Sequence, residues 1–349
     1  MTGMRWGFRP EPLDGELLSS YLVRSAGLHG VPADRFCVFH FPEFRIWTRD
    51  IDRSATTPFL DALSAKAELS LECVERMTLR DWEPLVSNRA HRGMASWINA
   101  LGVYHRVRLR HGLQYCPMCI AGVPAYKKTW RLSFVTTCEI HGCVLFDACP
   151  CCDAPIIPHR QLAGALRCHN CHRSLIGTLL PIPEQSLPVT ALQNECLHAL
   201  GTGFADVGGA RVRAGAYFRG LRILASVSLE RGCGKSQGDA VSCGLPMECM
   251  RTANRVAALC ALASLLAAWP KSFRHRAADW CWTQRMFCRR SVPAWLYREV
   301  RRLPRGRVRR TRARQSLRAK LTSLGRWKPE GWRGTRAVLL VCAAQECRR

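Results

Sequence analysis

Apolar residues in the first third of the chain recur at the spacing of a helix. The earliest run has an apolar face made of Leu18, Tyr21, Leu22 and Ser25. Asp14 is a candidate N-cap for this helix, and Glu16 would lie in its first turn. The pattern predicts a short helix, which is ended by Gly27, Gly30 and Pro32.

A second helical signal opens at Thr57-Pro58, and its apolar face is made of Phe59, Leu60, Leu63 and Ala67. After a short turn, Ser70 is placed to cap a helix whose inward residues are Leu71, Val74 and Met77. The outward residues of that helix, Glu72 and Glu75, would repel phosphates. Three interpretations stay open: a structural helical hairpin, a helix-turn-helix that docks a protein, and one that reads bases.

The period shifts to two from Val103, where Val103, Val107 and Leu109 alternate with Arg106, Arg108 and Arg110. This alternation predicts a strand with one arginine face. That face is either a solvated strand surface or a contact for phosphates.

The C-terminal half carries weaker helical signals over 187–200, 212–229 and 256–269, the last ended by Pro270. A further segment, 289–297, contains Trp295 and would cap a final helix against DNA or a partner. We therefore expect a second helical region over 181–300, with helix-turn-helix units as one interpretation.

The charge balance points to a polyanionic partner. The chain has 349 residues, enough for two or three domains, and carries 52 Lys and Arg against 26 acids, a formal charge of +26. More than half of that surplus follows residue 300, where 16 basic residues stand against two glutamates. Low hydrophobicity with high charge predicts a disordered basic arm over 301–349, which would add sequence-independent DNA affinity. A shifted reading frame is the alternative that this abrupt change in composition leaves open.

The expected cellular compartment decides whether the cysteines indicate disulfides or metal binding. The opening sequence MTGMRWGFRPEPLDGE lacks the apolar stretch of a signal peptide, and the longest apolar run, 256–269, is shorter than the roughly 20 residues that cross a bilayer. We therefore expect a cytoplasmic protein with no membrane partner. In a reducing compartment, 20 cysteines indicate metal binding rather than disulfides.

Four ligand pairs with two-residue spacers dominate the middle of the chain. They are Cys116 and Cys119, Cys138 and His141, Cys149 and Cys152, and Cys168 and Cys171. This spacing lets a tight turn aim two donors at one ion, and eight donors complete two tetrahedral sites. Sequential pairing gives one site with three cysteines and a histidine and a second site with four cysteines, while pairing of the first with the third pair is also open. Cys143, Cys151, His169 and His172 lie nearby, and we do not expect the two histidines to be ligands.

The predicted cofactors are two structural Zn²⁺ ions, because two filled tetrahedra leave no open position for water. No carboxylate pair, Ser/His/Asp order, HExxH motif or nucleotide loop stands out in the sequence. A thiolate held by zinc in a closed site is not available for attack. We therefore do not expect an enzyme.

The segment 126–134 between the first two pairs interleaves aromatic and basic residues. Such a segment can stack on bases while it grips phosphates, with Lys127, Lys128 and Arg131 as the candidate contacts. The alternative places Trp130, Leu132 and Phe134 on the packed face of a ribbon strand. In both cases we expect the basic residues to be exposed.

The stretch YCPMC, KKTWRLSFVTTCEIHGCVLFDACPCC and CHNC resembles the TniQ family of transposition proteins, which are related to the TnsD target selectors. The opening PEPLDGELLSSYLVRSAGLHG is similar to the family's N-terminal helix motif. The resemblance covers about residues 8–180. It favours the sequential pairing, with Cys116, Cys119, Cys138 and His141 at one site and Cys149, Cys152, Cys168 and Cys171 at the other.

The resemblance implies an accessory protein that selects the target DNA and works beside a DDE transposase and an AAA+ ATPase. It leaves open an RNA-guided targeting complex as a partner and a homodimer as the assembly. The alternative function is a zinc-ribbon DNA-binding transcription regulator, which needs neither transposition partner.

The expected fold class is mostly α with small β zinc ribbons, in which helix-turn-helix domains flank a tandem zinc-ribbon module. We expect a helical domain over 1–110, the double zinc ribbon over 111–180, a helical region over 181–300 and the arginine-rich tail over 301–349.

Overall fold

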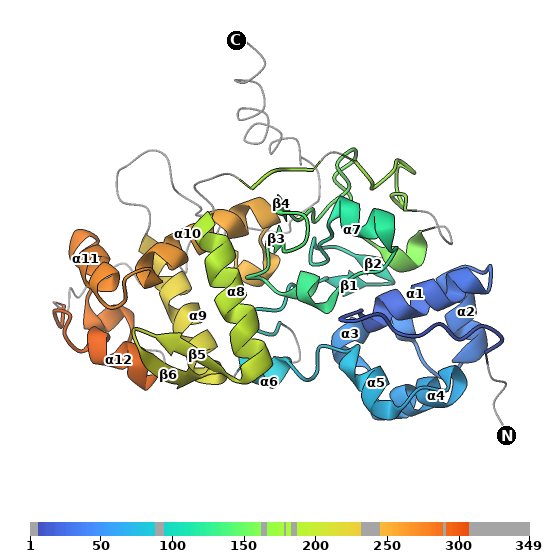
Figure 1. Ribbon diagram of the computed structural model, residues 1–349, viewed down its shortest axis with the longest axis horizontal. Helices are drawn as coiled ribbons and strands as arrows, with labels where there is room; N and C mark the ends of the chain where they lie inside the picture. The colour runs from blue at the N-terminus through green and yellow to red at the C-terminus, as the bar shows by residue number, and fades with distance from the viewer. Residues whose placement is uncertain are drawn as a thin grey trace, which may run out of the picture. The chain divides into compact units, whose positions relative to one another are not determined.

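A computed structural model of the chain describes residues 6–87, 94–161, 166–177, 179–182, 187–231, 245–288 and 291–306. Residues 1–305 form one compact unit (Figure 1), and 306–349 form a second, of which only Gly306 is described. From residue 307 onward, the predicted arginine-rich tail lies outside the described residues.

The N-terminal part is helical, as predicted. Its elements are α1 (Leu18–Leu28), α2 (Ala33–His40), η1 (Ile46–Thr48), α3 (Ile51–Ser54), α4 (Thr57–Ala67), α5 (Leu71–Arg76) and α6 (Glu83–Val86). The first five helices share a hydrophobic cluster that includes Trp6, Tyr21 and Phe59. The helix predicted from Thr57 is confirmed, with the same four residues buried, and Pro58 lies in its first turn.

Two details of these helices differ from prediction. Helix α1 begins at Leu18 rather than at Asp14, because Glu16 is buried and bridges to Lys127 in an extended conformation. Ser70 caps α5 as predicted, accepting a hydrogen bond from the Cys73 N–H at 3.2 Å. Leu71 was expected to face inward, but it is 37% exposed because it begins a six-residue helix at the surface.

The predicted strand from Val103 is wrong, since the chain reverses within it. Strand β1 (Val103–Tyr104) pairs antiparallel with β2 (Val107–Arg108). His105 and Arg106 form the turn with φ angles of 45° and 63°, the left-handed conformations of a two-residue hairpin turn. The arginines therefore do not share one face.

The middle part consists of short elements joined by turns. They are α7 (Pro117–Gly122), η2 (Lys128–Arg131), β3 (Thr137–Cys138), β4 (Cys143–Val144) and η3 (Pro158–Arg160). Strands β3 and β4 pair antiparallel, with Cys138 opposite Cys143. Together with the helices, these small sheets agree with the predicted mostly helical fold class.

The C-terminal part is built on three long helices: α8 (Leu187–Thr202), α9 (Ala214–Arg231) and α10 (Thr252–Leu266), in which α10 packs against α8 and α9 (Figure 1). The remaining elements are β5 (Phe204–Val207), β6 (Ala210–Arg213), η5 (Met247–Cys249), α11 (Lys271–Asp279), η6 (Gln284–Met286) and α12 (Ala294–Val300). All three predicted helices are present. The β5–β6 hairpin was not predicted, and it shortens the start of α9.

The middle and C-terminal parts share one hydrophobic cluster. Trp97 donates from its indole nitrogen to the Phe218 carbonyl at 3.0 Å, and Phe134 stacks on Phe218. Trp295 of α12 is 8% exposed and donates to the Ala216 carbonyl, so its ring packs inward rather than toward a partner. Folding of residues 111–180 as a separate domain stays a prediction.

Two pairs of consecutive helices are joined by short connections, but helix-turn-helix units stay a prediction. Helices α4 and α5 pack together across a short turn, and α10 and α11 are bent by 117° at a short break. A DNA-reading role for either pair stays a prediction. Within the described residues, no single helix is long and apolar enough to cross a membrane. Helices α10 and α11 are long and apolar enough only when taken together, as a pair bent at the break between them.

Gly220 lies where α9 meets Trp295. A Cβ added there would clash with the Trp295 ring. We expect Gly220→Ala to destabilise the fold by about 1–3 kcal/mol, the usual cost of overpacking, as measured by urea unfolding. Gly201→Ala in α8 is the matched control, because an added Cβ there meets nothing within 4 Å. Equal unfolding midpoints for the two variants would contradict this packing.

Candidate metal centres

Four predicted ligands converge between α7 and the β3–β4 hairpin. The donor atoms of Cys116, Cys119, Cys138 and His141 all lie within 4.8 Å of one another. Cys116 is the N-cap of α7 and Cys119 lies within that helix, whereas Cys138 ends β3 and His141 follows in the turn. The structure therefore groups the first two pairs, as sequential pairing requires.

The donor separations fit a tetrahedral ion. The Cys119 sulfur lies 3.6 Å from the Cys138 sulfur and 3.2 Å from Nδ1 of His141. The same nitrogen is 3.5 Å from the Cys116 sulfur and 3.6 Å from the Cys138 sulfur. Donors arranged tetrahedrally at zinc–ligand distances of 2.0–2.3 Å lie about 3.3–3.8 Å apart. This first centre can hold a metal ion, and its donor set suits zinc.

The second centre groups Cys149, Cys152, Cys168 and Cys171, whose sulfurs also lie within 4.8 Å of one another. Cys149 and Cys171 are 3.6 Å apart, as are Cys152 and Cys168. Four thiols at this spacing form a set that can hold zinc in a closed site. The interleaved pairing is therefore wrong for this structure.

The same backbone turn recurs in three of the four ligand pairs. In each, the residue four positions after the first cysteine donates its N–H to the carbonyl of that cysteine, and the three donors are Gly142, Asp153 and His172. All three have φ between 53° and 58°, in the left-handed region. This turn folds the chain back so that both donors of a pair face one point. It also explains why His172 is not grouped with the ligands.

The thiols differ in acidity. Burial raises the pKa of Cys149 to about 12. A hydrogen bond from the Arg173 backbone lowers the pKa of Cys171 to about 7. Because zinc binds thiolates, metal binding has to release protons from the more basic thiols, and acid opposes it.

Other residues near the centres have different environments. Cys143 is buried, with its sulfur 3.6 Å from that of Cys116, and sequence reasoning left its role unassigned. Cys151 is exposed. Arg251, at the start of α10, forms ion pairs with Asp147 at 3.0 Å and Asp153 at 2.8 Å, beside the second centre. These contacts fasten the second centre to the C-terminal helices, and no motif in the sequence indicated them.

Arg131, a predicted nucleic-acid contact, is fully buried instead. Its guanidinium binds Asp50 at 2.6 Å and Asp52 at 2.9 Å, and it donates to the Asn99 carbonyl at 3.0 Å. Burial acts to raise the pKa of Asp50, but the charge of Arg131 outweighs it and holds this pKa below its usual value. The prediction that Arg131 is exposed is therefore wrong, because two carboxylates of the N-terminal helices neutralise it.

Lys128 and Arg108 are also buried, each with 4% of its surface exposed. Lys128 binds Asp81 at 3.0 Å, donates to the Arg76 carbonyl at 2.6 Å and lies over the Trp82 ring. Arg108 donates to the Ile156 carbonyl at 3.1 Å, and burial lowers its pKa to about 10. Neither side chain is free to reach a phosphate, so the prediction of nucleic-acid contact is wrong for both.

The remaining candidates are placed differently. Arg106 and Arg110 are exposed, and Lys127 is half-buried. Arg106 lies at the turn of the β1–β2 hairpin, whereas Arg110 follows β2. Nucleic-acid contact by these three residues stays a prediction.

The N-terminal motif PEPLDGELLSSYLVRSAGLHG packs against the segment 126–134. Leu17 donates its N–H to the Tyr126 carbonyl at 2.9 Å, and the Tyr126 N–H donates to the Ser20 hydroxyl at 2.9 Å. Ser19 donates to Asp52 through both its N–H and its hydroxyl. Trp130, Leu132 and Phe134 are buried, as the packed-face alternative expects, but residues 128–131 form the 3-10 helix η2, so the ribbon strand of that alternative is wrong. The two motifs therefore bind each other, and they join α1 to the first centre.

His159 makes the stability of the chain depend on pH. Its ring stacks on Trp47 at 4.4 Å, and burial lowers its pKa to about 3. The folded chain therefore keeps His159 neutral while the unfolded chain takes up a proton below about pH 6.5, so stability falls as the pH is lowered. Between pH 7 and 5 this group should remove about 2 kcal/mol of unfolding free energy.

We expect His159→Phe, which keeps the stack, to lose about 2 kcal/mol less than the wild type over that interval. Urea unfolding at both pH values measures the difference. Equal losses in the two proteins would show that His159 is not buried in its neutral form.

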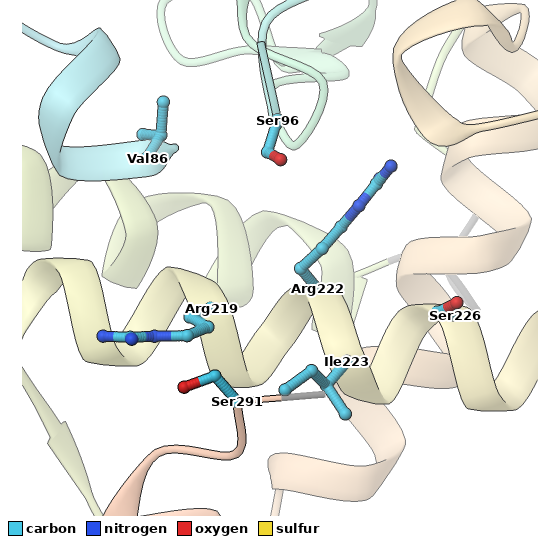
Figure 2. A pocket seen from close by; sticks show the side chains of 7 residues that line it. All are labelled: Val86, Ser96, Arg219, Arg222, Ile223, Ser226 and Ser291. Atoms are coloured by element: carbon cyan, nitrogen blue, oxygen red, sulfur yellow. The ribbon is translucent and has the colours of Figure 1, made fainter. Parts of the chain in front are cut away.

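A cavity of about 340 Å³ opens beside α9, and it is lined by Val86, Ser96, Arg219, Arg222, Ile223, Ser226 and Ser291 (Figure 2). Figure 2 shows the two guanidinium groups pointing apart. Arg222 is paired with Glu248 through two contacts of 2.9 Å, which neutralise its charge. We assign no ligand to this cavity.

The TniQ family model matches residues 7–145 of the chain. Comparison with curated proteins gives no match. The matched segment contains α1, the aspartates that bind Arg131, and all four donors of the first centre. TniQ proteins are non-catalytic accessory proteins of transposition. The match covers residues 7–145 of 349, so less than half of the chain, and over that part the chain is similar to TniQ proteins.

Proposed function

We propose that this chain is a target-selection adaptor of transposition. It binds target DNA or a targeting complex and recruits an AAA+ ATPase and a DDE transposase. The observation that carries the proposal is the TniQ match, which spans both the N-terminal helices and the first centre. The buried contacts between these parts support the proposal, since they join both parts within one compact unit.

In this proposal, two Zn²⁺ ions fill the two centres and act structurally. The first is held by Cys116, Cys119, Cys138 and His141, and the second by Cys149, Cys152, Cys168 and Cys171. Four protein donors complete each tetrahedron, so the ions supply folding energy and no catalytic water. The adaptor acts in the cytoplasm, where its thiols stay reduced.

The β1–β2 hairpin is the proposed contact for nucleic acid. Tyr104 is 63% exposed beside His105, and Arg106 is exposed at the turn. An exposed aromatic ring next to a guanidinium suits stacking on a base together with a phosphate contact. The His159 ring nitrogen lies 3.3 Å from the Arg106 carbonyl and fixes the turn.

We expect Arg106→Ala to weaken DNA binding and to reduce the slope of log affinity against log salt by about 1. Fluorescence anisotropy over a salt series measures this slope. Arg35→Ala, which removes an exposed arginine from α2, is the matched control and should leave the slope unchanged. Identical slopes for both variants and the wild type would remove the hairpin from the DNA interface.

Recruitment is tested by a pull-down of the element's ATPase on immobilised target DNA, with and without this chain. ATPase retained only when the chain is present supports the adaptor. ATPase binding without affinity for naked DNA would favour a targeting complex, including an RNA-guided one. DNA binding with no recruitment of the ATPase would favour the transcription regulator instead.

A further inference from the structure

The first centre has a fifth potential donor. The Cys143 sulfur lies 3.6 Å from the Cys116 sulfur. The sulfurs of Cys119 and Cys138, two of the four grouped donors, have the same separation. Cys143 is 1% exposed, so its thiol faces the interior of the centre rather than solvent. It is not among the four residues whose donor atoms all lie within 4.8 Å of one another.

The β3–β4 register places this thiol. Cys143 is the direct partner of Cys138 across the hairpin. Directly opposed residues of an antiparallel pair point to the same face, so both sulfurs lie on the side of the metal centre. His141 reaches the centre from the turn between the strands, where Gly142 has φ of 53°. One hairpin therefore carries three donors: Cys138, His141 and Cys143.

The two candidates for the fourth position have different supports. His141 is half-buried in a turn whose neighbour Ile140 is 66% exposed. Cys143 lies in a paired strand and also bridges to Pro181. Its sulfur already lies at a ligand-to-ligand distance from that of Cys116.

We propose that Cys143 is a reserve ligand of the first centre. When His141 does not supply Nδ1, the Cys143 thiol releases its proton to solvent and its thiolate takes the fourth position on the ion. The donor set changes from three thiolates and an imidazole to four thiolates, and the net charge of the occupied centre changes from −1 to −2. The inference rests on the proposal that this centre holds zinc.

The second centre provides a contrast within the same chain. All four of its donors are thiols, and Cys151, the neighbouring cysteine, is exposed on the turn between Cys149 and Cys152. Loss of a buried donor such as Cys168 should therefore cost the second centre its ion. The first centre should tolerate the loss of one particular donor, His141.

The experiment compares zinc per chain in the wild type, His141→Ala, Cys143→Ser and the double variant, with Cys168→Ser as the control. We expect two ions in the wild type and in each of the first two single variants, and one ion in the double variant and in Cys168→Ser. Cobalt substitution gives a second readout, because sulfur-to-cobalt charge transfer grows with the number of thiolates. His141→Ala should match His141→Cys combined with Cys143→Ser, which serves as the four-thiolate standard.

Fewer than two ions in the wild type would contradict the zinc proposal itself. Two ions in the wild type with one in His141→Ala would overturn the reserve-ligand inference alone. Failure to obtain folded His141→Ala while Cys143→Ser folds normally would also overturn it. A cobalt spectrum of His141→Ala that shows three thiolates would exclude Cys143 as the replacement.

Discussion

Replacing Cys168 by Ser is expected to lower the zinc content from two ions per chain to one and to unfold the second centre. Cys168 is 3% exposed, and its sulfur lies 3.6 Å from that of Cys152. Zinc binding contributes about 10–16 kcal/mol to the folding of small zinc peptides. A loss of this order rivals the total stability of a domain, about 5–15 kcal/mol. Elemental analysis and thermal unfolding measure the two effects.

Cys151→Ser is the matched control for that variant. It changes a cysteine of the same loop, but its side chain is exposed and belongs to neither donor group. We expect it to keep two zinc ions and the wild-type melting temperature. The ligand assignment would be wrong if Cys151→Ser lost zinc and Cys168→Ser retained it.

Replacing Arg131 by Ala is expected to destabilise the chain by about 3–5 kcal/mol, because it leaves the buried carboxylate of Asp52 and the largely buried one of Asp50 without their partner. Asp52 is 1% exposed, and Asp50 binds the same guanidinium at 2.6 Å. Burial raises the pKa of Asp52 even with Arg131 present. Loss of the Arg131 charge would therefore further destabilise the ionised carboxylate of Asp52. Urea unfolding gives the change in free energy.

A second variant separates the buried charge from the lost contacts. Arg131→Met combined with Asp50→Asn and Asp52→Asn removes the charges together, so we expect it to be more stable than Arg131→Ala. Arg106→Ala removes an exposed arginine and should change the free energy of unfolding by less than about 0.5 kcal/mol. Equal effects of Arg131→Ala and Arg106→Ala would contradict the buried network.

The metal ligands were predictable because their signal is local. Cys116 and Cys119, like the other pairs, are joined by a single turn, so spacing alone indicates that both donors face one ion. The grouping of pairs needed more than spacing, which left the interleaved arrangement open. Cys143 escaped assignment because its closeness to Cys116 depends on the register of the β3–β4 hairpin, and no local pattern encodes that register.

The basic residues were mispredicted because their partners are distant in the sequence rather than local. Lys128 and Arg131 have the character of a nucleic-acid contact when only segment 126–134 is considered. Their carboxylate partners, Asp81, Asp50 and Asp52, lie 47 to 81 positions earlier in the chain. Pairing over such distances is decided by tertiary packing. A buried ion pair and an exposed phosphate contact therefore use the same residue types.

The single strand predicted from Val103 failed because alternation does not show where a chain reverses. Neither His105 nor Arg106 is a glycine, yet both adopt left-handed conformations in the turn. The reversal changes the functional interpretation. It buries Arg108 against the Ile156 carbonyl and leaves Arg106 at the exposed tip.

Two motifs within the TniQ match contact each other in the fold. The Glu16 to Ser20 segment and the Tyr126 to Arg131 segment hold each other, through Leu17, Ser20 and the Asp52 carboxylate that both Ser19 and Arg131 contact. The first centre then fixes the chain that follows. Hydrogen bonds and ion pairs thus join the N-terminal helices to the segment that leads into the first centre.

The zinc content of the purified wild-type chain decides whether two closed zinc centres stabilise this fold. Elemental analysis should find two zinc ions per chain, one for each group of four donors. One ion or none, in protein that is folded and whose cysteines are reduced, would show that at least one of the two groups of donors does not bind zinc.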